Sequence, residues 1–289
     1  MNDKRPKIGL VIGAGGIKCA AALGVYETLT ACGHDVDLLV GCSGGAIYAA
    51  CLALGYSAAA AEEAICATWT REITQVKRPF SYLVAFLPQY AAFKESFGLR
   101  DDRLIMERLE ATFGAARIEE TAVPLRINAT DFDTGEAVVF EKGRLVDLIR
   151  ASIAIPGVFQ PWRMAGRLYS DGMLSNPLPI DVAAAAGVDI IIAVGFRRPI
   201  RQQITNARRY KAHVHAIMSN SLLQTKVALC QDAYAADILF LEPDFGEPVH
   251  IFDAHKIPQV VAAGRQSMWQ QMDWLEKRLC QQSNLRKEF

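Results

Sequence analysis

The chain has 289 residues, 51% of them hydrophobic, which is enough to build a substantial buried core and excludes a disordered protein. Lys and Arg together number 31, as do Asp and Glu, so no overall charge attracts the chain to nucleic acid, and we expect no nucleic-acid partner. Seven cysteines are scattered without C-x-x-C pairs, an odd number that favours reduced thiols in a cytosolic protein over a disulfide framework.

The N-terminal segment superficially resembles a signal peptide. Three basic residues among the first seven precede an apolar stretch that ends near Val25. Glycines and Lys18 interrupt this stretch, however, and no convincing cleavage site follows. No window contains the ~18 uninterrupted apolar residues that a membrane-spanning helix needs. We therefore expect a cytoplasmic protein, and peripheral contact with a membrane stays open.

The first half of the chain alternates strands with helices. Residues 7–12 form a compact apolar run that predicts a buried strand, and the alanine-rich residues 19–32 predict a helix. A second strand is expected at 36–40, followed by a helix from 44 to about 55, and Ser57 is placed to cap the next helix. Two strand–helix units in succession imply parallel strands with right-handed crossovers, and hence an α/β fold.

Residues 79–97 interrupt this alternation. Aromatic residues are concentrated here with few charges between them: Phe80, Tyr82, Phe86, Tyr90, Phe93 and Phe97. The segment is either a loop and helix packed on the core or a mobile lid or lipid-facing surface over the active site. Residues 101–113 then predict an amphipathic helix.

The second half continues the alternation. The run 189–196 is apolar and rich in β-branched residues, which predicts a central buried strand. No internal repeat or low-complexity linker is present, so we expect a single domain. The remaining predicted elements are strands at 125–130, 137–140, 168–170 and 238–241, and helices at 145–152, 180–186, 204–235 and 257–278.

A G-x-S-x-G sequence follows the second predicted strand, as Gly41-Cys42-Ser43-Gly44-Gly45. With a strand before it and a helix after it, this pattern is typical of a turn that exposes a nucleophilic serine at a helix N-terminus. Gly41, Gly44 and Gly45 remove the Cβ atoms that would clash in such a turn. The alternative is a glycine-rich turn that Ser43 merely caps.

A serine nucleophile needs a base. The five histidines, at positions 34, 213, 215, 250 and 255, lack the sequence context of a triad histidine, although His250 and His255 stay open. Asp171 is the strongest alternative, because it ends a predicted strand and Gly172 lets the backbone bend beside it. The other reading of this pair is an Asp-Gly turn at a strand end.

The glycine-rich segment Gly13-Ala14-Gly15-Gly16-Ile17-Lys18 follows the first predicted strand. Consecutive small residues before a helix can direct several backbone N–H groups into one anion-binding concavity. A dinucleotide fingerprint would need glycine where Lys18 stands, and no Walker Gly-Lys-Ser/Thr sequence is present. An oxyanion site is the remaining interpretation.

Taken together, these three segments resemble the patatin-like phospholipase family, whose signature is a glycine-rich loop with a basic residue, then G-x-S-x-G, then Asp-Gly. The resemblance runs from about residue 7 to 196 and includes further matches at 124–131, 134–135, 151–159 and 176–177. It implies a three-layer α/β fold with a mostly parallel central sheet flanked by helices. Residues 7–200 would be the catalytic core, and 201–289 a helical C-terminal extension completing the same domain.

The resemblance also implies the site. Ser43 would be the nucleophile and Asp171 the base of a dyad that needs no metal and no cofactor. The N–H groups of Ala14, Gly15 and Gly16, with that of Gly44, would form the oxyanion hole. Lys18 would position a phosphate or the loop itself. Gly13, Gly41, Gly45 and Gly172 complete the motifs, whereas Ala14, Cys19 and Met173 stand where the family often has glycine.

The implied function is a lipid acyl hydrolase that cleaves phospholipid, lysophospholipid or a related ester through an acyl-serine intermediate. The substrate would be a lipid, with peripheral membrane contact through residues 79–97. Two alternatives stay open. An acyl-carrier transacylase has a similar turn but needs a histidine partner, and a regulatory or scaffolding protein could retain an idle dyad. The sequence does not indicate the oligomeric state.

Overall fold

The fold is built on one eight-stranded sheet in the order β5-β6-β3-β2-β1-β7-β8, with β4 also paired to β3. The computed structural model describes residues 5–74, 98, 100–200, 203–250 and 253–285. Strands β1, β2, β3, β7 and β8 run parallel, whereas β4, β5 and β6 add antiparallel pairs at one end. The strands are β1 Ile8–Ile12, β2 Leu38–Cys42, β3 Leu125–Asp131, β4 Ala137–Phe140, β5 Trp162–Met164, β6 Arg167–Asp171, β7 Ile190–Val194 and β8 Asp237–Leu241.

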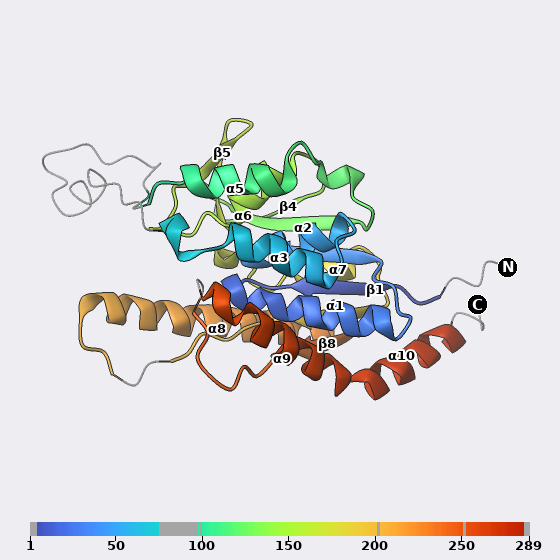
Figure 1. Cartoon of the computed structure of the whole chain (residues 1–289). Helices are drawn as coiled ribbons and strands as arrows, with labels where there is room; N and C mark the ends of the chain where they lie inside the picture. Colours follow the sequence, from blue (N-terminus) through green and yellow to red (C-terminus); the bar gives the residue numbers. More distant parts are fainter. Residues whose placement is uncertain (1–4, 75–97, 99, 201–202, 251–252, 286–289) are drawn as a thin grey trace, which may run out of the picture.

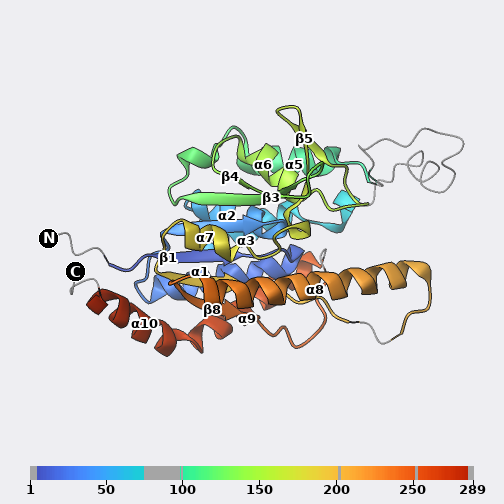
Figure 2. The ribbon, with the colours of Figure 1, turned by 180° about the vertical axis from the view of Figure 1, so that it is seen from behind.

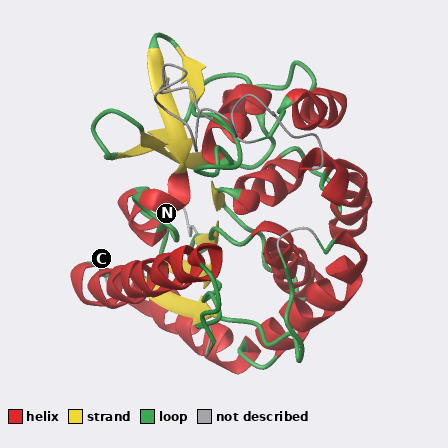
Figure 3. Cartoon of the chain, turned by 90° about the vertical axis from the view of Figure 1, so that its left-hand side faces the viewer, coloured by secondary structure: helices red, strands yellow, loops and turns green. Residues whose placement is uncertain are grey.

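Helices cover both faces of this sheet, so the predicted three-layer α/β class is confirmed (Figure 3). Figure 1 looks onto the face with α1, α3 and α9, and Figure 2 onto the face with α7 and α8. The helices are α1 Ala21–Ala31, α2 Gly44–Ala53, α3 Ala58–Thr68, α5 Arg103–Phe113, α6 Leu145–Ser152, α7 Ile180–Ala185, α8 Ala207–Ala233, α9 Ile257–Trp269 and α10 Met272–Leu285, with single 3₁₀ turns η1 Gly16–Ala20, η2 Arg71–Thr74, η4 Ile118–Glu120, η5 Gly172–Leu174 and η6 Ala254–Lys256.

The central strands are apolar on both faces because each face has its own core. Leu10 and Ile12 of β1 belong to the larger core, and Val11 between them belongs to the smaller core under α7 and α8. Strand β7 alternates in the same way and lies between β1 and β8, buried along its length as its apolar run predicted. A strand covered on both sides reads as a continuous apolar run rather than an alternating one.

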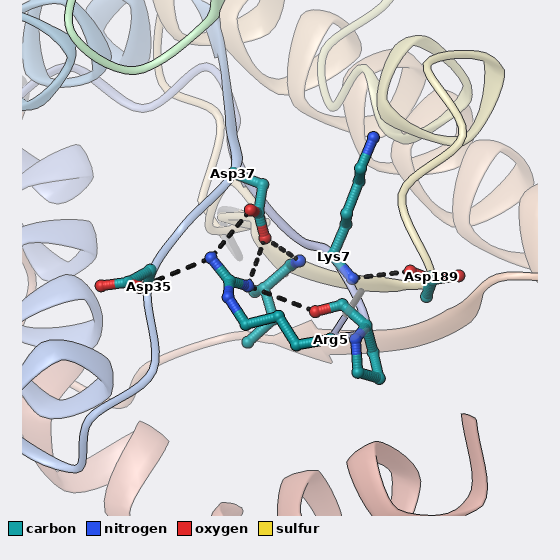
Figure 4. Close-up of polar contacts among 7 residues, drawn as sticks. Arg5, Lys7, Asp35, Asp37 and Asp189 are labelled. Carbon is teal, nitrogen blue, oxygen red and sulfur yellow. Dashed lines mark hydrogen bonds and ion pairs between the residues drawn. The ribbon is translucent and has the colours of Figure 1, made fainter. Parts of the chain in front are cut away.

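Carboxylates at the N-terminal ends of the strands fix where β1 enters the sheet (Figure 4). The Asp37 carboxylate accepts hydrogen bonds from the Ile8 amide, at 2.7 Å, and from the Arg5 guanidinium, at 2.8 Å. The Asp189 carboxylate accepts from the Lys7 amide at 2.6 Å. Because Asp37 serves as this anchor, β2 begins at Leu38 rather than at residue 36, where the sequence analysis expected it.

Two further expectations are corrected, and one short strand was missed. The region 257–278 contains two helices, because the Gln271 amide bonds to the Met268 carbonyl in a tight i→i−3 turn that ends α9. The region 19–32 opens with the 3₁₀ turn η1 before α1 begins. Strand β5 was not predicted, since its three residues are too short for a pattern. The aromatic segment 79–97 lies outside the described residues.

Helix α6 is held by a fully buried arginine. The Arg150 guanidinium donates to the Asp102 carboxylate at 2.9 Å and to the Gln160 carbonyl at 3.0 Å. It also lies 5.0 Å from the Trp162 ring centroid. Arg150 thereby ties α6 to the residue that precedes α5 and to the start of β5. Since α6 carries Ser152, which contacts Ser43, this ion pair also supports the site.

We predict that Arg150→Met lowers the free energy of unfolding by about 3–5 kcal/mol, because the ion pair between the Arg150 guanidinium and the buried Asp102 carboxylate is lost. Urea denaturation would measure the loss. The matched control is the double variant Asp102→Asn/Arg150→Met, which should lose less than Arg150→Met alone. Equal losses in the two variants would contradict this account.

Candidate active site

Ser43 occupies a sharp turn between β2, which ends at Cys42, and α2, which begins at Gly44. Its backbone has φ +55° and ψ −127°, a conformation that is strained for a residue with a side chain. The Ser43 amide donates to the Ser152 hydroxyl at 2.8 Å, and that hydroxyl donates to the Asn128 carbonyl at 2.6 Å. The neighbouring α6 and β3 therefore hold the strained turn in place.

The structure brings Asp171 to Ser43. The Ser43 hydroxyl donates a hydrogen bond of 2.7 Å to Oδ2 of Asp171, and both side chains are buried. Sheet register explains this contact between residues 128 positions apart. Cys42 pairs with Asn128 across β2 and β3, and Asp171 pairs with Ala129 across β3 and β6. Ser43 and Asp171 thus lie on either side of Ala129.

The Asp171 carboxylate is fixed by its own surroundings. Its Oδ1 accepts a hydrogen bond from the Met173 amide at 2.9 Å, so Oδ2 is left to face the serine. The Asp171 carbonyl accepts from the Thr130 hydroxyl at 2.9 Å, and its amide donates to the Ala154 carbonyl at 3.1 Å. The bond at Met173 uses the backbone, so the departure from glycine at this position preserves it.

Gly172 lets the acid come this close. A Cβ atom on Gly172 would lie 2.5 Å from the Asn128 carbonyl oxygen and 2.9 Å from the Cys42 sulfur, closer than side-chain atoms approach one another. The Asn128 amide group also donates to the Gly172 and Asn176 carbonyls, both at 3.1 Å. Asn128 therefore joins the turn after Asp171 to the end of β2.

Burial raises the pKa of the Asp171 carboxyl from 3.8 to about 6. The hydrogen bonds from Ser43 and Met173 and the nearby positive charge of Arg198 oppose this rise. Asp171 is therefore ionised at neutral pH but retains a higher proton affinity than an exposed aspartate. A buried carboxylate with this pKa can accept a proton from a serine hydroxyl.

The glycine-rich loop lies beside Ser43, with one correction to its expected role. The Ala14 amide donates to the Pro177 carbonyl at 2.9 Å, so it is not available to an oxyanion, because that backbone bond fixes the loop to the segment before α7. Within the described ranges, no acceptor is found for the amides of Gly15, Gly16 and Gly44. All three residues line one cavity with Ser43.

The two glycine motifs meet backbone to backbone. A Cβ atom on Gly44 would lie 2.8 Å from both the Cα and the amide nitrogen of Gly16, so only glycine fits there. Gly41 lies in β2 against the start of α2, and Gly45 lies in α2 against the end of β1. Gly13 follows β1 and donates to the Val194 carbonyl at 2.9 Å.

The cavity at Ser43 has a volume of about 270 Å³ and combines positive charges with apolar walls. Lys18 is half-buried in η1, where its ammonium group lies 3.4 Å from the Arg197 carbonyl. Burial and the charge of Arg198 lower the pKa of Lys18. The residues that line the cavity include Trp69, Ile155, Met173, Phe196, Val249 and, from α8, Ala212 and Ala216.

Arg198 and Ser152 are site residues to which the sequence analysis gave no role. The Arg198 guanidinium lines the cavity, 3.2 Å from the Met173 sulfur, and its charge acts on Asp171. The sequence could have indicated Arg198 as a site residue. It follows β7 at the carboxyl ends of the parallel strands, where α/β sheets bind ligands. Ser152 lies in the family match at 151–159, but its role could not be read from the sequence, since that role depends on contact across the fold.

The histidines divide into one cavity residue and four others. His250 lines the cavity, whereas His34 lies at 2.8 Å from Glu276 on the opposite end of the fold. In the part of the chain that the structure describes, no histidine makes a hydrogen bond to Ser43 or Asp171. In this geometry the Asp171 carboxylate, rather than a histidine, accepts the hydrogen bond from the Ser43 hydroxyl.

The described residues were also found to lack a metal-binding cluster and a membrane-spanning helix. They contain no group of three His, Cys, Asp or Glu side chains arranged to hold a metal ion. None of their helices combines the length and the apolar character needed to cross a bilayer.

We predict that Asp171→Asn stabilises the protein more at alkaline than at acidic pH. The folded-state pKa of Asp171 is raised, so its contribution to folding is fully present below about pH 4 and is lost as the pH rises toward 6. Asparagine removes this cost, which is about 3 kcal/mol at most. Thermal unfolding of both proteins at about pH 4.5 and about pH 8 measures it. An equal difference in Tm at the two pH values would contradict the prediction.

Several known proteins are similar to this chain. The sequence profile of the patatin-like phospholipase family matches residues 10–184, more than half of the chain. An uncharacterized NTE family protein of Mycobacterium bovis is 31% identical over 234 residues, which cover 81% of this chain and 60% of that protein. Patatin-like phospholipase domain-containing protein 6 of Mus musculus is 29% identical over 192 residues, which cover 65% of this chain and 13% of that protein.

Among solved structures, VipD from Legionella pneumophila matches with a TM-score of 0.46 and 12% identity, covering 93% of this chain and 67% of that one. The chain spans about 60% of the length of the first curated relatives that it matches. The profile match over more than half of the sequence is the decisive finding, and it shows that the chain belongs to the patatin-like phospholipase family.

Proposed function

We propose that this protein is a serine hydrolase that cleaves fatty acyl esters of lipids through a dyad of Ser43 and Asp171. The observation that carries the proposal is the buried 2.7 Å hydrogen bond from the Ser43 hydroxyl to the Asp171 carboxylate. Membership of the patatin-like phospholipase family supports a lipid ester as the substrate.

In the first step, the Asp171 carboxylate accepts the Ser43 proton while Oγ attacks the ester carbonyl. The carbonyl oxygen becomes negatively charged, and the amides of Gly15, Gly16 and Gly44 stabilise it as an oxyanion hole. The N-terminus of α2, which starts at Gly44, adds its dipole. Protonated Asp171 then gives its proton to the departing alcohol, which leaves an acyl-serine.

In the second step, a water molecule replaces the alcohol. Asp171 removes a proton from this water as it attacks the acyl carbonyl, and the same amides stabilise the oxyanion. The bond to Ser43 Oγ then breaks, the serine regains a proton from Asp171, and the free fatty acid leaves. Every proton is carried by the one carboxylate.

The cavity supports an ester that joins an acyl chain to a negatively charged head group. Apolar side chains such as Phe196 and Val249 can contact the chain, and Lys18 and Arg198 supply positive charge at the same cavity. This combination fits a phospholipid or lysophospholipid. The bond from Lys18 to the Arg197 carbonyl supports a second role in positioning the loop.

We further propose that residues 7–200 and 201–289 form one domain. Strand β8 pairs with β7 along its full length, and Gly264 of α9 lies against the Ala21 backbone of α1. The cytoplasmic location and the membrane contact through residues 79–97 stay predictions, since the latter segment lies outside the described residues.

The two alternative functions, transacylase and idle regulatory protein, would each need a different arrangement at Ser43. An acyl-carrier transacylase needs a histidine partner for its serine, yet the Ser43 hydroxyl bonds to Asp171. An idle regulatory protein would not need Asp171 bonded to Ser43 or amides beside it without acceptors. Both arguments favour the hydrolase, and an assay with a short-chain p-nitrophenyl ester separates all three functions.

We predict that Ser43→Ala abolishes release of fatty acid from this ester and from phospholipid vesicles, with a loss of at least about 10³-fold. Asp171→Asn should lower kcat/KM by about 10²–10⁴-fold, because the general base is removed. His250→Ala is the control for a histidine mechanism and should retain most of the activity. Activity that survives Ser43→Ala, or loss in His250→Ala with Asp171→Asn tolerated, would refute the dyad.

We also predict an acid limb in the pH profile. kcat/KM should fall as the pH drops through about 6, where Asp171 becomes protonated. Arg198→Met should move this limb to higher pH, because the positive charge that opposes the rise in the Asp171 pKa is lost. The control is Arg197→Gln, since Arg197 forms an ion pair with Glu242 at 2.7 Å and should shift the limb less. Coincident limbs for the wild type and Arg198→Met would contradict this role.

A further inference from the structure

The N-terminal half of α8 carries a row of exposed apolar side chains, Tyr210, Val214, Ile217 and Met218, which we call the α8 stripe. Their spacing of i, i+4, i+7 and i+8 places them on one face of the helix. Each is between 36% and 66% exposed. Of the twelve large hydrophobic residues that are exposed in the described chain, six lie within residues 200–218, so this exposure is concentrated in one segment.

The opposite face of the same helix belongs to the active site. Ala212 and Ala216 line the cavity at Ser43, and Ala216 and Leu223 are buried against the body. The α8 stripe therefore points away from the cavity wall that the helix provides. Figures 1 and 2 show the N-terminal part of α8 extending past the ends of the neighbouring helices.

Charge is distributed unevenly along this part of the chain. Residues 190–231 contain seven Lys and Arg and no Asp or Glu, although the whole chain has a formal net charge of zero. Arg209 and Lys211 lie next to the α8 stripe in sequence, and neither forms an ion pair within the described ranges. The stripe is thus accompanied by positive charge without acidic residues nearby in the helix.

We propose that the α8 stripe is a docking surface for a bilayer that contains anionic phospholipid. Apolar side chains on one face with cations beside them are the features of a helix that lies in the membrane interface. Anionic lipid attracts the adjacent Lys and Arg side chains, and the apolar side chains enter the boundary between head groups and acyl chains. A protein partner would need acidic groups to match the same surface.

Docking in this orientation holds the protein at the bilayer, with α8 between the lipid surface and the cavity wall formed by Ala212 and Ala216. The catalytic role of this surface rests on the proposed function, because only a lipid hydrolase finds its substrate in the bilayer that the stripe would bind. Binding to the bilayer does not require hydrolysis, so the two proposals can fail separately.

The test is co-sedimentation of the full chain with phosphatidylcholine vesicles, with and without phosphatidylglycerol. The Ser43→Ala background keeps the lipid intact. We expect binding to the vesicles that contain phosphatidylglycerol, and weaker binding as salt rises. Ile217→Asp/Met218→Asp should weaken this binding by roughly tenfold or more, and Lys211→Gln by about fivefold.

The matched control is Leu229→Asp, which changes an equally exposed side chain (59%) about three turns further along α8. It should bind vesicles as its parent does, and thermal unfolding should report folded protein for every variant. Absence of vesicle binding by the parent, or equal binding by Ile217→Asp/Met218→Asp, would overturn the proposal. The proposal would also be overturned if the parent protein bound no vesicles but formed a dimer in sedimentation analysis, and if these substitutions dissociated that dimer. The stripe would then contact a second copy of the chain.

Discussion

The hydrogen bond between the Ser43 hydroxyl and the buried Asp171 carboxylate is the interaction on which the rest of the site depends. It joins β2 to β6 across β3, and it requires β6 to run antiparallel so that its last residue faces the turn after β2. Ser152 and Asn128 hold the two backbones at this point, and Gly172 leaves room for them. This pair needs no third side chain to orient the Asp171 carboxylate, because the Met173 amide does so.

The burial of Asp171 also lowers the stability of the fold. Burial away from water raises the pKa of the Asp171 carboxyl. At neutral pH the folded state therefore carries a negative charge that is less favourable than the same charge in the unfolded chain. The positive φ of Ser43 adds backbone strain. Hydrogen bonds through Ser152 of α6 join the strained turn to β3 and keep it in place. The buried charge and the strained turn both lower the stability of the folded state. Burial of the two hydrophobic cores, one on each face of the sheet, offsets this loss.

Sequence patterns predicted the parts of this structure that depend on local chemistry. Apolar runs predicted β1 and β7, and the glycine motifs predicted the turn at Ser43 and the Asp171-Gly172 pair, which the structure brings together. The acceptor of the Ala14 amide could not be predicted, since Pro177 approaches it only in the folded chain. The break after α9 and the short β5 also escaped, because neither carries a helix breaker or an alternating pattern of useful length.

The most direct test of the dyad and its oxyanion hole is a crystal structure of the protein after reaction with an alkyl fluorophosphonate. The account predicts phosphorus bonded to Ser43 Oγ, with the phosphoryl oxygen about 2.7–3.1 Å from at least two of the amides of Gly15, Gly16 and Gly44. The Asp171 carboxyl should still face the bonded Oγ. Phosphorus on another residue, or a phosphoryl oxygen directed away from these amides toward His250, would contradict the central claim.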